Sequence, residues 1–94
     1  MKLSNKDKKY LLSIGALEDD FEQMEKVTKH TKYEYFTKED ESIVTTITQK
    51  KSIEILGRER FLIGLLRSAF HRSAVQYNDN GEYVLFDSEK FFKS

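Results

Sequence analysis

The residues best placed to bind a ligand lie in one stretch of the chain, residues 56–72, which holds every arginine of the sequence. Arg60, Gly64, Arg67 and His71 stand at helical spacing, so a helix over this stretch would place them on one face. Two guanidinium groups and an imidazole on one face make a binding site for an anion, either a phosphate or an acidic protein surface. The competing interpretation is a solvated face whose charges pair within the chain.

Glycine in a helix costs about 1 kcal/mol relative to alanine. Gly64 therefore indicates the close approach of something else, either another structural element or the backbone of a ligand. Two further arginines flank the face, so the predicted basic face consists of Arg58, Arg60, Arg67, His71 and Arg72.

A predicted acidic face precedes it in the chain and consists of Asp19, Asp20, Glu22 and Glu25. These carboxylates could present a phosphate-like array to a basic partner. The alternative is that they compensate the dipole at the start of a helix, where negative charge is stabilising.

The chain contains no arrangement typical of an enzyme or a metal protein. It has no cysteine, which excludes disulfides and thiolate metal sites. Its histidines, His30 and His71, stand in neither an HxxxH nor an HxH pattern, and there is no glycine-rich phosphate loop. We therefore predict a non-enzymatic protein with no metal and no cofactor.

An aromatic segment with lysines on both sides, Tyr33, Tyr35 and Phe36, is a second candidate surface. In a strand, Tyr33 and Tyr35 point to one face and Phe36 to the other. Such a strand could stack nucleobases. The alternative is that one of its faces covers the core.

Composition limits the possible functions further. The 94 residues are predicted to form a single domain, 1–94, and their net charge is zero. Only residues 48–73 are clearly basic, with six basic against two acidic side chains, a net +4. A global basic footprint for nucleic acid is thus absent, although a local one remains. No secretory signal or membrane-spanning run is recognised, so we expect a soluble, cytoplasmic protein without a membrane partner.

The elements that must position these residues follow from capping and periodicity. Ser4 and Asp7 form a capping box, Thr48 and Asp87 are further N-caps, and Asn80-Gly81 indicates a hairpin turn in which both residues accept positive φ. Apolar periodicity places Ile14, Phe70 and Phe92 toward the core. The predicted class is α+β in the order ααββααββα, with two antiparallel hairpins packed against helices. Its helices cover residues 5–14, 18–29, 49–56 and 58–73 and a short segment after 87, and its strands cover 31–37, 43–47, 75–77 and 82–86.

Three blocks of the chain, residues 11–15, 18–25 and 56–71, resemble a group of small uncharacterised proteins. Those proteins are carried on phages and conjugative elements of low-GC Gram-positive bacteria. The resemblance implies an accessory protein of a mobile element and no particular activity. The chain departs from the group at Arg72, where an aromatic residue is expected.

These observations favour a non-enzymatic protein-binding module of a mobile element, which could inhibit a host nucleic-acid-directed defence enzyme such as an RNA-guided nuclease. The partner would meet the basic or the acidic face. The alternative function is a small nucleic-acid-binding accessory protein that uses the Arg60/Arg67/His71 face. A third hypothesis makes the same face an oligomer interface, so the chain would be a monomer or a small homo-oligomer.

Overall fold

The structure is a computed structural model and describes residues 2–92. Its elements follow the predicted order ααββααββα and confirm the α+β class. The helices are α1 (Asn5–Ser13), α2 (Glu18–Thr28), α3 (Gln49–Leu56), α4 (Arg58–His71) and α5 (Glu89–Phe92). The strands are β1 (Lys32–Thr37), β2 (Thr45–Ile47), β3 (Ser73–Tyr77) and β4 (Glu82–Asp87).

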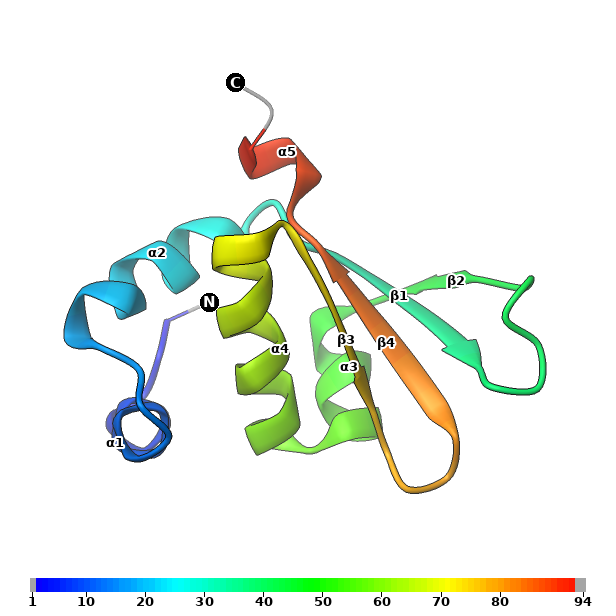
Figure 1. The fold of residues 1–94 in the computed structure, drawn as a ribbon, viewed down its shortest axis with the longest axis horizontal. Coiled ribbons are helices and arrows are strands. Elements are labelled where there is room, and N and C mark those ends of the chain that lie inside the picture. Colours follow the sequence, from blue (N-terminus) through cyan, green and yellow to red (C-terminus); the bar gives the residue numbers. More distant parts are fainter. Residues whose placement is uncertain (1, 93–94) are drawn as a thin grey trace.

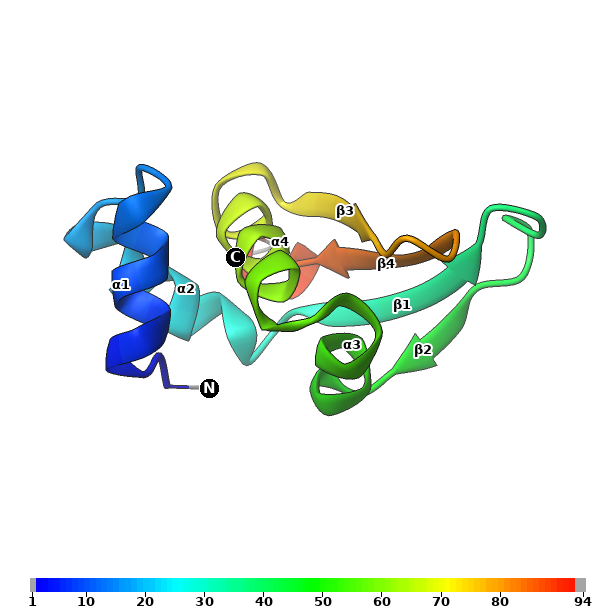
Figure 2. The same ribbon diagram turned by 90° about the horizontal axis from the view of Figure 1, so that it is seen from below.

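The four strands form one antiparallel sheet in the order β2-β1-β4-β3. Each hairpin, β1–β2 and β3–β4, is sequential, and the pairing of β1 with β4 joins the two hairpins at the centre of the sheet. β2 and β3 are therefore the edge strands. Figures 1 and 2 show α4 between the sheet on one side and α1 and α2 on the other, with α3 beside α4.

Alternation along the strands separates a core face from an open face. Tyr33, Val84 and Phe86 point inward and are buried, and they pack with Phe61 of α4. Phe36, Tyr83, Tyr77, Leu85 and Val75 occupy the alternate positions, and we call the surface they form the open face. In Figures 1 and 2 none of the helices α1 to α4 lies over this face.

Local signals explain where the helices begin and end. The Ser4 hydroxyl accepts from Asp7 N–H, and the Asp7 carboxylate accepts from Ser4 N–H, which confirms the capping box. The Thr48 hydroxyl caps α3 in the same way by accepting from Lys51 N–H. Gly57 separates α3 from α4 with a φ of 82°, a conformation that side chains with a Cβ rarely adopt.

Three apolar residues that we predicted to face the core are exposed. Phe70 is 48% exposed and Ile14 is 45% exposed, because the segment that joins α1 to α2 leaves a groove beside the last turn of α4. Phe92 is also exposed, whereas its neighbour Phe91 packs against the core. Helical periodicity identified the apolar side of each helix but not how far its neighbours extend over that side.

Two turns also differ from the prediction. α4 ends at His71 rather than residue 73, because Arg72 takes a positive φ of 69° and β3 begins at Ser73. In the β3–β4 turn only Gly81 has a positive φ. The four-residue loop is closed by Asn78, whose side-chain oxygen accepts from the N–H groups of residues 80 and 82, so Asn80 keeps an ordinary conformation.

Candidate protein-binding groove

Arg58, the first member of the predicted basic face, is part of the scaffold. Its Nε and Nη2 donate to the two carboxylate oxygens of Asp7, at 3.1 and 2.7 Å. The Asp7 side chain is only 5% exposed, so this bidentate ion pair joins the start of α1 to the start of α4. The hydrogen bond from Arg58 is the largest of the effects that lower the pKa of Asp7 below its ordinary value.

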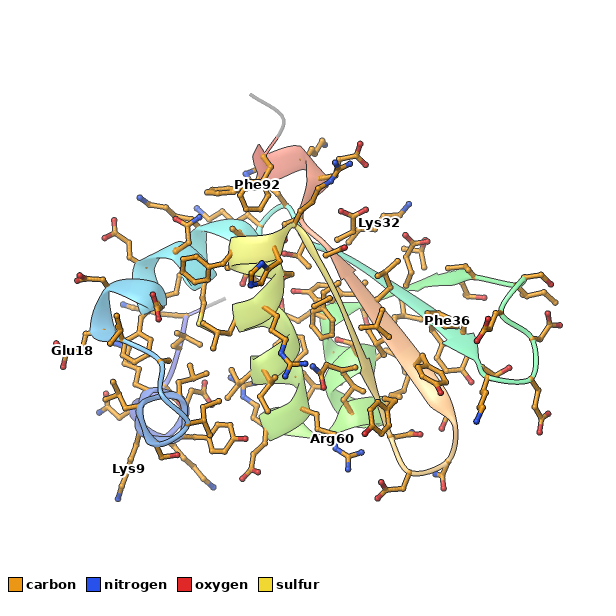
Figure 3. The ribbon with its side chains drawn as sticks, viewed as in Figure 1. Lys9, Glu18, Lys32, Phe36, Arg60 and Phe92 are labelled. Atoms are coloured by element: carbon orange, nitrogen blue, oxygen red, sulfur yellow. The ribbon has the colours of Figure 1, made fainter. Side chains whose placement is uncertain are left out.

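Arg60 and Arg72 also have partners within the chain. Arg60 Nη1 donates to the carbonyl of Tyr77 at 2.9 Å, and its Nη2 lies 3.1 Å from the Asp79 carboxylate. Figure 3 shows Arg60 at the foot of α4, beside the turn between β3 and β4. Arg72 Nη2 lies 3.1 Å from Glu89 Oε1 and so connects the end of α4 to α5. For these two arginines, the interpretation of charges paired within the chain is the better one.

Gly64 does not belong to a solvated face either. A Cβ placed on Gly64 would lie 2.4 Å from Cε1 of Phe86, far inside van der Waals contact. The close approach that the glycine indicated is therefore the approach of another element, strand β4. This contact between α4 and β4 also interrupts the predicted basic face, because Gly64 lies between Arg60 and Arg67 on the helix.

Arg67 and His71 remain, and neither has a hydrogen-bond or ion-pair partner within residues 2–92. Both line a groove of about 380 Å³ between the last two turns of α4 and the segment that joins α1 to α2. We call this feature the α4 groove; its lining residues are Ile14, Gly15, Ala16, Asp20, Leu66, Arg67, Phe70 and His71.

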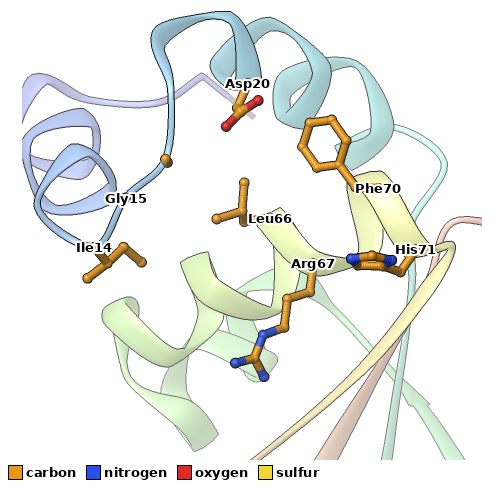
Figure 4. A pocket seen from close by; sticks show the side chains of 8 residues that line it. Ile14, Gly15, Asp20, Leu66, Arg67, Phe70 and His71 are labelled. Carbon is orange, nitrogen blue, oxygen red and sulfur yellow. The ribbon is translucent and has the colours of Figure 1, made fainter.

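The α4 groove combines apolar walls with cations on one side. Figure 4 shows Ile14, Leu66 and Phe70 around the space, with Arg67 and His71 beside them and Asp20 on the opposite side. The Asp20 carboxylate accepts from the backbone N–H of Leu17 at 2.8 Å, so it caps α2 while it lines the groove. An exposed aromatic ring beside an unpaired guanidinium is typical of the centre of a protein interface.

The predicted acidic face divides in the structure. Glu25 accepts from the backbone N–H of Leu3 at 2.9 Å, and Glu22 pairs with Lys26 at 3.1 Å. Asp20 caps α2 and lines the α4 groove, which leaves Asp19 as the one member whose side chain has no hydrogen bond or ion pair in the described part of the chain. The helix-dipole and local-pairing interpretation therefore accounts for most of this cluster.

The aromatic segment of β1 contributes to both faces of the sheet. Tyr33 is buried against Phe61 and Phe86, and Tyr35 donates from its hydroxyl to Glu82 at 2.9 Å. That hydrogen bond is the main cause of a raised pKa for Tyr35, while burial raises the pKa of Tyr33. Both tyrosines thus belong to the core side, as the alternative interpretation holds.

Phe36 lies on the open face, where sequence reasoning missed its neighbours. Its ring stacks on Tyr83 with a centroid separation of 5.3 Å, and Tyr83 contacts Tyr77 at 6.1 Å. Tyr77 and Tyr83 are directly paired across the β3–β4 hairpin. A four-residue loop over 78–81 would pair Tyr77 with Glu82, whereas the register pairs Asn78 with Glu82 and Tyr77 with Tyr83, so loop length alone does not predict this contact.

Comparison with known proteins adds no assignment, because no protein-family profile, curated protein or solved structure matches the chain. Within residues 2–92, no three histidine, aspartate or glutamate side chains are grouped so that they could hold a metal ion. In the same residues no helix has the length and apolar character needed to cross a membrane.

Proposed function

We propose that this chain is a non-enzymatic protein-binding module and that the α4 groove is the surface that receives its partner. The observation that carries the proposal is the convergence of exposed apolar side chains with Arg67 and His71, neither of which has a partner in the described residues. Phe70 supplies an aromatic anchor, and partners of such anchors fill the adjacent space with aliphatic or aromatic groups.

The chemistry of the groove defines the kind of partner. An apolar side chain of the partner would rest between Ile14, Leu66 and Phe70, and a carboxylate beside it would pair with Arg67. We therefore expect an amphipathic, acidic protein segment. Complementary charge would steer its docking and fix its orientation more than it would add affinity.

The test uses paired variants of the whole chain and a purified partner. Immobilised protein captures candidates from a lysate of a low-GC Gram-positive bacterium, and the enriched protein is then purified and titrated by calorimetry. Arg67→Glu and Phe70→Ser each remove a groove contact, and we expect each to weaken binding at least about tenfold. Lys50→Glu and Val44→Ser are matched controls, because they make the same kinds of change at exposed positions outside the groove.

Two outcomes oppose the proposal. Either no protein is enriched at any salt concentration, or the purified partner binds the groove variants and the control variants with equal affinity. In the second case the partner uses another surface, and the apolar and cationic groups of the α4 groove have no role in recognition.

We propose that the partner in the cell is a host defence enzyme that acts on nucleic acid. The small size of the chain and its sequence resemblance to proteins of mobile elements support this choice. Adding an excess of the chain to a purified RNA-guided nuclease should slow DNA cleavage, and Arg67→Glu should restore it. Unchanged cleavage at saturating excess would remove such a nuclease from the possible partners.

Direct nucleic-acid binding through Arg60, Arg67 and His71 has less support than protein binding. Arg60 already pairs with Asp79, and Gly64 of the same face is occupied by Phe86. Fluorescence polarisation with single- and double-stranded DNA and RNA, at low and moderate salt, separates the two functions. Affinity that falls steeply with salt would favour nucleic acid, because phosphate contacts release counterions.

A further inference from the structure

Strand β3 is an unprotected edge of the sheet, on a different surface from the α4 groove. Natural proteins protect exposed edges with charged residues, proline, bulges or very short strands. β2, at the other edge, has only three residues. β3 has five residues, Ser73–Tyr77, none of them charged or proline.

The hydrogen-bond pattern shows which backbone groups of β3 face outward. Asn78 N–H donates to Glu82 O and Ser88 N–H donates to Arg72 O, so residues 72 and 78 bond toward β4. In an antiparallel ladder the bonding direction alternates, and Ser73, Val75 and Tyr77 therefore direct their N–H and C=O groups away from β4. The Tyr77 carbonyl fits this direction, because it accepts from Arg60 on the outer side of the strand.

Two side chains of β3 are also largely exposed to solvent. Val75 is 45% exposed and Tyr77 is 58% exposed on the open face. On the core side, Gln76 is 8% exposed, and its Nε2 has no hydrogen-bond partner in the described residues. This nitrogen is enclosed by the chain's own atoms and is out of reach of a partner, so Val75 and Tyr77 are the side chains that a second strand would cover.

We infer that β3 pairs antiparallel with β3 of a second copy of this chain, about a two-fold axis at Val75. Val75 then pairs with the partner's Val75, and Ser73 pairs with the partner's Tyr77. This register brings only residues with outward backbone groups into hydrogen-bonded pairs, and it places all five residues of each strand opposite one another. The result is a continuous sheet of both copies, with Leu85, Val75 and their symmetry mates in one apolar row.

Charge favours a second copy over other partners for this edge. The strand is uncharged, so two copies meet without repulsion along it. At its ends Arg60 is neutralised by Asp79, and Arg72 by Glu89. A polyanion such as single-stranded nucleic acid would find no unpaired cation on β3, and on the open face beside it Lys32 already pairs with Glu34, while Asp87 adds a carboxylate.

Arg60 limits the strength of this pairing. Because it occupies the Tyr77 carbonyl, the two strands can form four backbone hydrogen bonds without displacing it: two between the Val75 residues and two from Tyr77 N–H to the partner's Ser73 carbonyl. We therefore expect a weak dimer, with a dissociation constant between about 1 µM and about 1 mM.

Charge exchange at the axis tests both the pairing and its register. Val75→Lys places two ammonium groups next to each other in the dimer, and Val75→Glu places two carboxylates there. Each variant alone should dimerise about tenfold to a hundredfold more weakly than the wild type. An equimolar mixture of the two should recover the dimer, because only the mixed pair brings opposite charges together. Val75→Thr is the control that keeps branching and exposure and should dimerise normally.

Analytical ultracentrifugation of the full chain over a concentration series gives the result, and circular dichroism shows that each variant is folded. The inference fails if the wild type remains monomeric at about 1 mM. It also fails if the lysine and glutamate variants dimerise like the wild type, or if their mixture does not recover the dimer. Arg67→Glu should leave self-association unchanged, which separates this edge from the α4 groove.

Discussion

Replacing Gly64 by alanine tests whether this position must lack a side chain so that α4 can pack closely on β4. On a solvent-exposed helix face the change should stabilise the protein by about 1 kcal/mol through helix propensity. In the structure the new Cβ meets Phe86 at 2.4, 2.6 and 2.9 Å. The Phe86 ring is fully buried, and the rings of Tyr33 and Phe61 lie 5.5 and 5.6 Å away, so it has little room to move.

The expected sign of the change follows from comparing these two effects. Inserting a methyl group into a well-packed core typically costs about 1–3 kcal/mol, and a contact at 2.4 Å with a confined ring belongs at the upper end. After subtracting the propensity gain, we expect Gly64→Ala to lower the free energy of unfolding by about 1–2 kcal/mol. For a domain of this size that corresponds to a melting temperature lower by about 4–16 °C.

Urea and thermal unfolding, followed by circular dichroism, measure this difference. Arg67→Ala is the control, because it changes an exposed position of the same helix and should alter stability by less than about 0.5 kcal/mol. In a Phe86→Leu background the cost of Gly64→Ala should shrink by about 1 kcal/mol, since the clashing ring atoms are gone. If Gly64→Ala is neutral or stabilising in the wild-type background, the proposed packing of α4 on β4 is wrong.

Three further predictions concern the scaffold. Arg58→Ala leaves the buried Asp7 carboxylate without its cation and should cost about 2–3 kcal/mol at neutral pH. Because the pKa of Asp7 is lowered in the fold, its contribution is present above the ordinary pKa of 3.8 and is lost as the pH falls below it, so acid denaturation of the variant should show a weaker pH dependence. Tyr33→Phe removes a buried hydroxyl that has no partner in the described residues and should keep or raise stability by up to about 1 kcal/mol. Since the pKa of Tyr33 is raised, wild-type stability should fall as the pH rises above 10.0, and the variant should lose less over that range in urea titrations. Asn78→Ala removes the side chain that closes the β3–β4 loop and should cost about 2 kcal/mol by urea unfolding.

Local signals predicted the elements of this fold well because each signal acts within a few residues. The hydroxyls of Ser4 and Thr48 cap helices that begin at the next residue, and the apolar spacing of Phe21, Met24 and Val27 matches the buried side of α2. The same reasoning set every strand end within two residues of its position in the structure; Ile43 and Val44, which we predicted to lie in β2, precede it and are exposed.

Exposure and pairing could not be predicted in this way, because they depend on residues far apart in the chain. Arg58 and Asp7 are separated by 51 positions, and Arg60 and Asp79 by 19. Periodicity places a side chain on a face of its helix, but it does not show which element covers that face. Whether Phe70 is buried or exposed depends on where the α1–α2 segment lies. That position follows from the packing of α1 and α2 on α4.

The four arginines show how structure narrows a candidate site that the sequence could only outline. Arg58 joins α1 to α4, Arg60 joins α4 to the β3–β4 turn, and Arg72 joins α4 to α5. Arg67 has no such role in the described residues and stands beside exposed apolar side chains in the α4 groove. Substitution of the first three should therefore be detected first as altered stability, whereas substitution of Arg67 should alter binding of a partner and leave the unfolding curve unchanged.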